Sequence, residues 1–239
     1  MYGVAAIAAI TAQNTVGVTG VQEIEPHLVA AQIGAVLSDF PVRAAKTGML
    51  SSAPIIEAVV DALDQAPDLP VVVDPVMVAK SGVRLLRPEA VTALKNHLLP
   101  RAALLTPNLP EAADLTGCPV DSEAEMRGAG AALLDLGPRA VLVKGGHLPG
   151  DRIVDLLFTD GEVHEFRRSR IHTRATHGAG CTLSAAIAAR LAAGQPLATA
   201  AHGAGAYVGL AMTRALPLGA GHGPLAHLPP DPWGGRLPA

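Results

Sequence analysis

Short apolar runs rich in β-branched residues alternate along this chain with segments whose apolar residues recur at helical spacing. Residues 71–77 (VVVDPVM) begin as a buried strand, whereas residues 26–39 place apolar side chains on one face of a helix. Hydrophobic residues make up 49% of the chain but aromatic residues only 3%, so the core must consist mainly of aliphatic side chains. The alternation predicts an α/β protein with a mainly parallel central sheet between two layers of helices.

The same patterns predict the individual elements. We expect strands in residues 4–11, where the alanines would also permit a helix, and in 103–106 and 140–143. Residues 44–50 predict a short strand that runs into a glycine turn, and the β-branched run at 71–77 predicts a buried strand with Asp74 at its carboxyl end. We expect helices in residues 26–39, 54–66, 88–97, 183–191 and 196–215, a short one from Asn108, and another between Ser122 and Gly137. Asp160-Gly161 between two apolar runs, 153–158 and 163–166, predicts a β-hairpin. Residues 1–228 are expected to form a single domain and the Pro-rich residues 229–239 an extended tail.

Charge and composition exclude several classes of protein. The formal net charge is −3, which gives no electrostatic reason to expect a nucleic-acid partner. The two cysteines, Cys118 and Cys181, do not make a disulfide framework. The sequence contains neither a long, strongly apolar window nor the pattern of a signal peptide. We therefore expect a cytoplasmic protein with no membrane partner.

The stretch from Thr176 to Leu183 (THGAGCTL) combines a glycine-rich turn with the start of an Ala-rich helix. The first N–H groups of a helix have no partner within it, and the helix dipole adds positive partial charge there. Gly178, Ala179 and Gly180 therefore predict an anion site, with phosphate as the preferred ligand. Cys181 would lie in the first turn, where the same field lowers the pKa of a thiol. The alternative is a glycine turn beside a buried cysteine, which is favoured for an isolated Gly-x-Gly.

Polar residues follow several of the expected strands. Asp74 and Lys144 each end a strand, where the active sites of open α/β sheets lie and where a lysine can reach a phosphate. Asp74 could equally cap the next turn. Asn108 and Glu111 could bind a hydrated Mg²⁺ or form an N-cap with its first-turn acid. For Gln13, spacing alone favours a solvated loop residue.

Together these residues suit a phosphoryl transfer, which needs a metal, a nucleophile and neutralisation of charge on the moving group. The glycine turn would donate N–H groups and Lys144 would supply a cation. Asn108, Glu111 and Asp74 would organise Mg²⁺, and Cys181 could accept a hydroxyl proton. The chain has no G-x-x-x-x-G-K-[ST] motif, which excludes a Walker-type NTPase.

Six motifs make the chain resemble the hydroxymethylpyrimidine and hydroxymethylpyrimidine-phosphate kinases of thiamin synthesis, within the ribokinase-like superfamily. In chain order the motifs are Thr11-Ala12-Gln13-Asn14-Thr15, Lys46-Thr47-Gly48-Met49-Leu50, Asp74-Pro75-Val76-Met77-Val78-Ala79-Lys80-Ser81-Gly82, Thr106-Pro107-Asn108-Leu109-Pro110-Glu111-Ala112, Val143-Lys144-Gly145-Gly146-His147 and Thr176-His177-Gly178-Ala179-Gly180-Cys181-Thr182. They occur in the order of the family and extend over nearly the whole chain.

The resemblance implies a ribokinase-like three-layer α/β/α fold, ATP and Mg²⁺ as cofactors, and a homodimer. It also implies phosphorylation of 4-amino-5-hydroxymethyl-2-methylpyrimidine and then of its monophosphate. Gln13 matches the residue that hydrogen-bonds the aminopyrimidine, and Met49 and Val76 match the apolar walls of that pocket.

The resemblance assigns the remaining site residues to the phosphates. Lys144 matches a lysine on the ATP phosphates, and Asn108 and Glu111 match the N-x-x-E element near Mg²⁺. Thr176 and His177 are expected near the nucleotide, and Gly178 to Gly180 match the anion hole. Cys181 falls where sugar kinases carry an aspartate base, so it would act as the base or position the substrate.

Two departures from the family pattern bear on these expectations. Family members begin about thirty residues earlier, with a strand whose absence would leave backbone groups of its neighbour unpaired. Ala220 stands where a lysine is often found, before Gly221-His222-Gly223-Pro224. Two alternatives remain open: a pyridoxal or pyridoxine kinase, which has the same Gly-x-Gly-Cys turn, and a non-catalytic nucleotide-binding protein.

Overall fold

A six-stranded sheet forms the centre of the computed structural model, which describes residues 2–78, 82, 84–159 and 161–228. The expected tail, 229–239, lies outside the described residues. The strand order is β3-β4-β5-β6-β7-β8. The bounds are β3 (Ala45–Thr47), β4 (Val71–Val73), β5 (Leu104–Leu105), β6 (Val141–Lys144), β7 (Arg152–Phe158) and β8 (Val163–Ser169).

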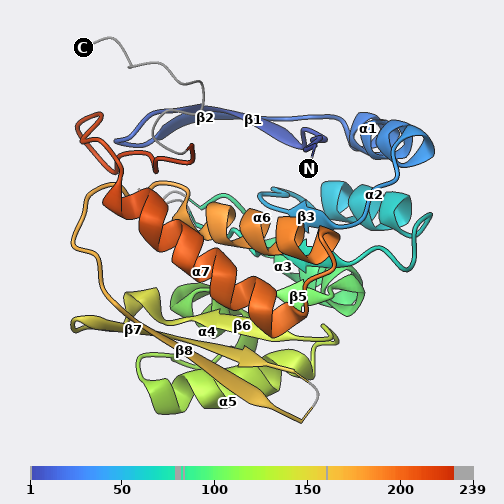
Figure 1. The fold of residues 1–239 in the computed structure, drawn as a ribbon. Coiled ribbons are helices and arrows are strands. Elements are labelled where there is room, and N and C mark those ends of the chain that lie inside the picture. Colours follow the sequence, from blue (N-terminus) through green and yellow to red (C-terminus); the bar gives the residue numbers. More distant parts are fainter. Residues whose placement is uncertain (1, 79–81, 83, 160, 229–239) are drawn as a thin grey trace.

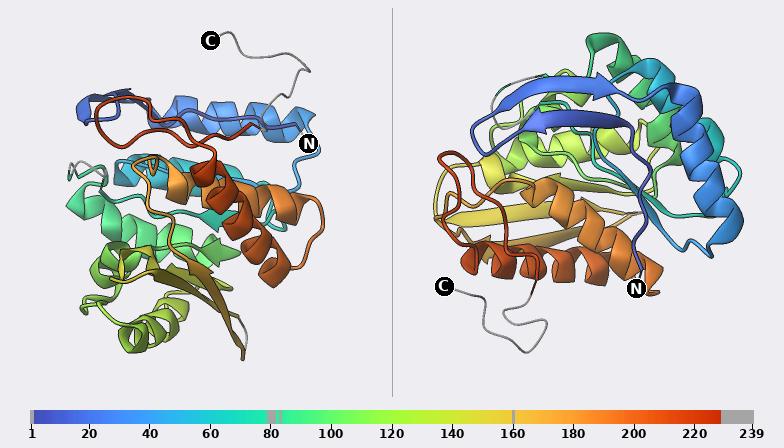
Figure 2. Two further views of the ribbon diagram at one scale, coloured as in Figure 1. Left: turned by 60° about the vertical axis from the view of Figure 1, so that its left-hand side comes forward. Right: turned by 90° about the horizontal axis from the view of Figure 1, so that it is seen from above.

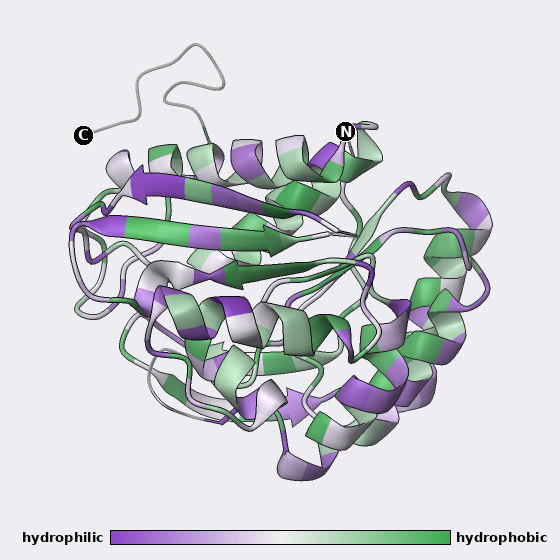
Figure 3. Ribbon diagram, turned by 90° about the horizontal axis from the view of Figure 1, so that it is seen from below, coloured by the Kyte–Doolittle hydropathy of each residue, from purple (hydrophilic) through white to green (hydrophobic). Residues whose placement is uncertain are grey.

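The pairing within the sheet confirms the predicted topology. Strands β3 to β6 run parallel, whereas β6 and β7 pair in antiparallel fashion. Strands β7 and β8 form the predicted hairpin, with Phe158 opposite Val163 next to the turn. Viewed from below, most of β7 is green and the outermost strand, β8, is largely purple, as expected for a strand at the edge of the sheet (Figure 3).

Helices cover both faces of the sheet and make the three predicted layers (Figure 1). On one face lie α2 (Ala53–Leu63), α3 (Pro88–Ala93), α4 (Leu109–Thr116) and α5 (Glu123–Leu134), with α1 (Pro26–Asp39) packed against α2. On the other lie α6 (Ala179–Ala192) and α7 (Leu197–Thr213). The sheet has a hydrophobic core on each face, and neighbouring residues of β4 point into different cores. Val73 packs with α2 to α5, and Val72 packs with α6 and α7.

Three short helical turns lie between these strands and helices. After α3 the chain continues through a π-helical turn, η1 (Leu94–Leu98), and a 3₁₀ turn, η2 (Leu99–Arg101). A second 3₁₀ turn, η3 (Gly145–His147), follows β6 directly. Within the described ranges, no helix is long and apolar enough to cross a membrane.

The N-terminal region differs from its prediction. Residues 4–11 were expected to form a buried strand, but β1 (Ala9–Gln13) and β2 (Val18–Glu23) form a separate antiparallel hairpin. It lies outside the helix layer that contains α6, as Figures 1 and 2 show. Ile10 is 58% exposed, and within the apolar run only Ala8 packs against the core. Apolar composition predicts a strand here, but burial depends on neighbours distant in sequence.

Candidate active site

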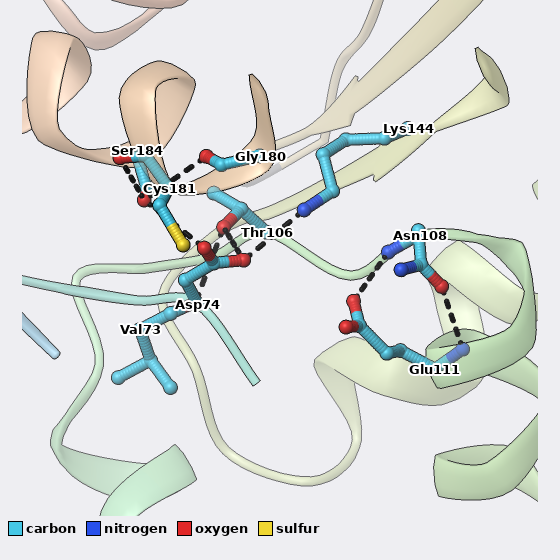
Figure 4. A network of polar contacts seen from close by, with 9 residues as sticks. All are labelled: Val73, Asp74, Thr106, Asn108, Glu111, Lys144, Gly180, Cys181 and Ser184. Carbon is cyan, nitrogen blue, oxygen red and sulfur yellow. Dashed lines mark hydrogen bonds and ion pairs between the residues drawn. The ribbon is translucent and has the colours of Figure 1, made fainter. Parts of the chain in front are cut away.

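Asp74 lies at the centre of a polar network at the carboxyl ends of the parallel strands (Figure 4). Its Oδ1 atom accepts hydrogen bonds from Lys144 Nζ at 3.1 Å and from Thr106 Oγ1 at 3.4 Å. Its Oδ2 atom accepts one from Ser184 Oγ at 3.2 Å. These partners come from β6, the end of β5 and α6, because parallel strands bring their carboxyl ends to one edge. Asp74 therefore joins three elements rather than capping only its own turn.

Lys144 remains charged within this network. Burial alone would lower the pKa of its ammonium group, but the carboxylates of Asp74 and Glu111 outweigh that effect and raise the pKa. Only 13% of the side chain is exposed. The strand end thus holds a fixed positive charge at the edge of the site, as the sequence predicts.

The glycine turn meets this charge at the start of α6. Gly178 is the N-cap residue and adopts φ 74°, a left-handed conformation that favours glycine. A Cβ atom on Gly180 would lie 3.3 Å from Lys144 Nζ, so the backbone passes close to the ammonium group. The first N–H groups of α6 and the lysine charge therefore converge, as an anion site requires.

Cys181 lies in the first turn of α6, with its thiol facing Asp74 (Figure 4). The prediction of a lowered pKa is wrong: burial, followed by the charge of Asp74, raises the pKa of the thiol. The charges of Lys46 and Lys144 oppose this increase but do not reverse it. The residue as a whole nevertheless keeps solvent-exposed surface. The helix N-terminus favours a thiolate, but loss of water and a facing carboxylate outweigh it.

Asn108 and Glu111 form a capping box at the start of α4. Glu111 N–H donates to Asn108 Oδ1 at 2.9 Å, and Asn108 N–H donates to Glu111 Oε2 at 2.8 Å. This is the structural alternative that the sequence left open, and it leaves Glu111 only 7% exposed. Burial raises the pKa of Glu111 to about 7, while the charge of Lys144 lowers it in part. Glu111 is therefore both a cap and a buried acid that interacts electrostatically with Lys144.

The three residues expected to bind the pyrimidine lie on separate segments. Gln13 ends β1 and is exposed, Met49 follows β3 and is half-buried, and Val76 follows β4. The Val76 N–H donates to the Asp74 carbonyl at 2.8 Å, which keeps Val76 next to the network. A cavity of about 10 Å³, lined by Val76 and Asp74 among others, has room for at most a water molecule. The assignment of these residues to a pyrimidine stays a prediction.

Thr176 and His177 are held by the segment that follows α7. His177 N–H donates to the Gly223 carbonyl at 3.0 Å, and Thr176 Oγ1 lies 3.1 Å from His222 Nδ1. His222 N–H also donates to the Thr15 carbonyl, at 2.8 Å, in the β1–β2 turn. The C-terminal segment therefore connects the hairpin to the approach to the anion turn.

Asp155 on β7 is a site-supporting residue that the sequence analysis missed. It is 2% exposed, and its carboxylate accepts hydrogen bonds from Gly145 N–H at 3.0 Å and from Arg168 at 2.6 Å. A Cβ atom on Gly145 would lie 2.0 Å from the Val154 carbonyl oxygen. The acid and the glycine together fix the turn directly after Lys144. Thr106 and Ser184 were also missed, because the strand and helix patterns do not reveal that they meet Asp74.

An α/β sheet with a lysine–carboxylate pair against a glycine-rich helix N-terminus is suited to holding and moving a phosphoryl group. The fold and site together define the class as an α/β kinase. The family model "phosphomethylpyrimidine kinase" matches residues 1–226. The chain belongs to the phosphomethylpyrimidine kinase family.

Curated relatives agree with this membership. The hydroxymethylpyrimidine/phosphomethylpyrimidine kinase of Rhizobium meliloti is 50% identical over 230 residues, which are 95% of this chain and 86% of that protein. The thiamine biosynthesis bifunctional protein ThiED of Geobacter sulfurreducens is 48% identical over 227 residues. That match includes 95% of this chain but only 46% of the bifunctional protein, so the chain spans less than half of that relative.

Solved structures confirm the ribokinase-like fold. The phosphomethylpyrimidine kinase of Clostridium difficile is 41% identical, with a TM-score of 0.78 and coverage of 88% of this chain and 86% of that one. The Bacillus subtilis pyridoxal kinase, solved as an ADP complex, is 34% identical, with a TM-score of 0.87 and coverage of 95% and 86%. Sequence identity therefore favours the pyrimidine kinase, whereas the backbone resembles both.

Proposed function

We propose that the chain transfers the γ-phosphoryl group of ATP to the hydroxymethyl group of 4-amino-5-hydroxymethyl-2-methylpyrimidine, and then phosphorylates the resulting monophosphate. The observation that supports this most strongly is the charged Lys144, held by Asp74 at the N-terminus of α6. The family relatives named for both pyrimidine kinase activities give the substrates. Thiamin biosynthesis is the pathway in which this product would be used, as the name of the Geobacter relative indicates.

The proposed transfer divides its tasks among the residues of the network. The turn from Gly178 to Gly180 donates N–H groups to the moving phosphoryl group, and Lys144 neutralises its charge. Cys181 accepts the proton of the substrate hydroxyl. Because the pKa of the thiol is raised, the thiolate is scarce at neutral pH and the first transfer should accelerate in alkaline solution. Thr176 and His177 would lie beside the nucleotide, before the turn.

The oxygen donors at the site fit Mg²⁺ through Glu111 better than through Asp74. Both oxygens of Asp74 already accept hydrogen bonds within the protein. One oxygen of Glu111 accepts the hydrogen bond from Asn108 N–H. Because burial raises the pKa of Glu111 to about 7, the ionised form of its carboxyl group becomes more favourable when a cation approaches. Mg²⁺ keeps several waters and binds through few carboxylates. When bound, it would neutralise charge on the ATP phosphates.

A pyridoxal kinase activity is the second candidate, supported by the TM-score of 0.87 to the Bacillus subtilis enzyme. Steady-state kinetics with Mg-ATP and each of the two alcohols separates the candidates. We expect a higher kcat/KM for the hydroxymethylpyrimidine. A higher value for pyridoxal would reverse the order, and nucleotide binding without turnover of either alcohol would support a non-catalytic binding protein.

The assembly is proposed to be a cytoplasmic homodimer, on the family resemblance. Exposed apolar side chains on the β1–β2 hairpin, including Ile10 and Val16, are compatible with contact to a second copy. Light scattering of the purified chain would give a dimer mass, whereas a monomer mass across micromolar concentrations would contradict this part of the proposal.

A further inference from the structure

Lys46 emerges from the sheet on the same side as the anion turn. It pairs in register with Val72 of the parallel neighbour β4, and residues in register point to the same face. Val72 packs with the residues of α6 and α7, as does Ala44, two positions before Lys46. Figure 1 shows β3 beside α6. The lysine therefore lies on the α6 face, near the carboxyl end of β3.

The ammonium group of Lys46 is directed toward the site. A Cβ atom on Gly48 would lie 2.9 Å from Lys46 Nζ, so the side chain runs along the strand to the edge where the network lies. Its charge also lowers the pKa of Cys181 in part, which is consistent with a position near that thiol. Lys46 on β3 and Lys144 on β6 thus belong to strands on either side of β4, which leads into Asp74.

The two lysines differ in their partners. Lys144 forms an ion pair with Asp74 at 3.1 Å. Within the described residues, Lys46 forms neither an ion pair nor a hydrogen bond, although it is half-buried. A partly desolvated cation without a protein counterion is unfavourable in the free enzyme and becomes favourable when an anion binds. Lys46 is therefore available to an anionic ligand without losing a protein partner, whereas Lys144 already forms an ion pair with Asp74.

We propose that Lys46 binds the phosphate group that the pyrimidine monophosphate brings to the second transfer, and so determines whether this enzyme accepts a phosphorylated substrate. The inference rests on the proposed function and adds a phosphate subsite to it. In this step an oxygen of the substrate phosphate forms a bond to the γ-phosphorus of ATP, and the bond from that phosphorus to the β–γ bridging oxygen breaks. The attacking phosphate dianion has no proton to give up. The second transfer therefore needs a cation beside the attacking group more than it needs a base.

The test compares the Lys46→Met and Lys46→Arg variants with the wild type, using the pyrimidine alcohol and its monophosphate as separate substrates. Methionine keeps much of the aliphatic length but removes the charge, whereas arginine keeps the charge and binds phosphate well. Lys95→Met is the matched control, because Lys95 lies in η1 with neighbours that pack against the other face of the sheet. Thermal unfolding and calorimetric binding of the monophosphate, in the presence of a non-hydrolysable ATP analogue, accompany the kinetics.

Lys46→Met is expected to reduce kcat/KM for the monophosphate about 10- to 100-fold more than kcat/KM for the alcohol. This difference corresponds to the loss of one hydrogen bond to a charged group. Lys46→Arg should restore most of that activity, and Lys95→Met should change neither substrate. Equal losses with both substrates, or a rise in the KM for ATP alone, would assign Lys46 to the nucleotide and overturn the proposal. Unchanged monophosphate binding and turnover would overturn it as well. A wild-type enzyme inactive on both pyrimidines would instead refute the proposed function.

Discussion

Replacing Glu111 with glutamine should stabilise the protein at neutral pH but not in acid. Glutamine can still accept the hydrogen bond from Asn108 N–H, so the capping box is retained. What the substitution removes is a buried carboxyl group whose pKa rises from 4.5 to about 7 on folding, mainly because burial disfavours its charged form. Since Glu111 is only 7% exposed, solvent screens this effect little.

The sign and size of the effect follow from proton linkage. Below pH 4.5 the group is protonated in both states and contributes no difference. Between 4.5 and about 7 the folded state binds the proton more tightly, so the wild type loses stability as the pH rises. Above that range the full penalty applies, and the pKa difference corresponds to about 3 kcal/mol. The glutamine variant does not titrate and avoids this loss.

Urea unfolding of both proteins at several pH values between 4 and 8, without ATP or Mg²⁺, measures the prediction. The free energy of unfolding of the variant minus that of the wild type should increase by about 3 kcal/mol across the range. Titrating groups that do not interact with Glu111 cancel in this difference. A difference that is flat with pH would refute the raised pKa, and one that decreases would show that Lys144 dominates over burial. Mg-ATP should reduce the pH dependence of the wild type if a cation approaches Glu111.

Three further substitutions test the remaining parts of the site. Cys181→Ala should lower kcat for the alcohol about 10²–10⁴-fold in steady-state assays, with a smaller effect on the monophosphate, and an unchanged kcat would exclude a base role. Lys144→Ala should remove about 3–4 kcal/mol of transition-state stabilisation, measured through kcat/KM. A change confined to the KM for the pyrimidine would contradict its assignment to the phosphates. Gly145→Ala should reduce the free energy of unfolding by about 1–3 kcal/mol or more, because the added methyl group would overpack against Val154. Gly146→Ala should leave the free energy of unfolding nearly unchanged, because its methyl group would meet open space. Equal urea midpoints for the two variants would refute this contrast.

Local sequence patterns predicted most of the elements. Residues 26–39 form α1 at the predicted bounds, because Pro26 suits the first turn of a helix and the apolar residues repeat at helical spacing. The Asp-Gly signal at 160–161 correctly indicated the hairpin of β7 and β8. Element ends were less accurate: the helix expected at 88–97 is α-helical only to Ala93 and continues as the π-helical turn η1.

Features that depend on distant neighbours could not be read from local patterns. Residues 4–11 are apolar enough for a core strand, yet β1 lies in an outer hairpin with Ile10 exposed. The pKa of Cys181 is raised first by burial and then by the charge of Asp74, which lies more than one hundred positions earlier in the chain. The position of Cys181 at a helix N-terminus, taken alone, predicted a lowered pKa instead of a raised one.

In the candidate site, too, local sequence patterns identified some residues, whereas others depend on neighbours distant in the chain. Asp74, Lys144 and the glycine turn were identified by their residue types at strand and helix ends, and they meet in the structure. Asp155 was missed because it lies in the middle of an apolar strand, where its hydrogen bond to Gly145 becomes evident only once β6 and β7 are paired. A carboxylate inside a buried strand next to a glycine-rich turn is the signal that could have revealed it.

The most direct test of the central claim is the number of ADP molecules released per molecule of hydroxymethylpyrimidine when Mg-ATP is in excess. A coupled assay run to completion with limiting pyrimidine gives this ratio, and phosphorus NMR identifies the product. The proposed function predicts two ADP per pyrimidine and a diphosphate ester as the product. One ADP per pyrimidine with the monophosphate accumulating would contradict the second transfer and the Lys46 subsite, and no ADP release would contradict the kinase assignment itself.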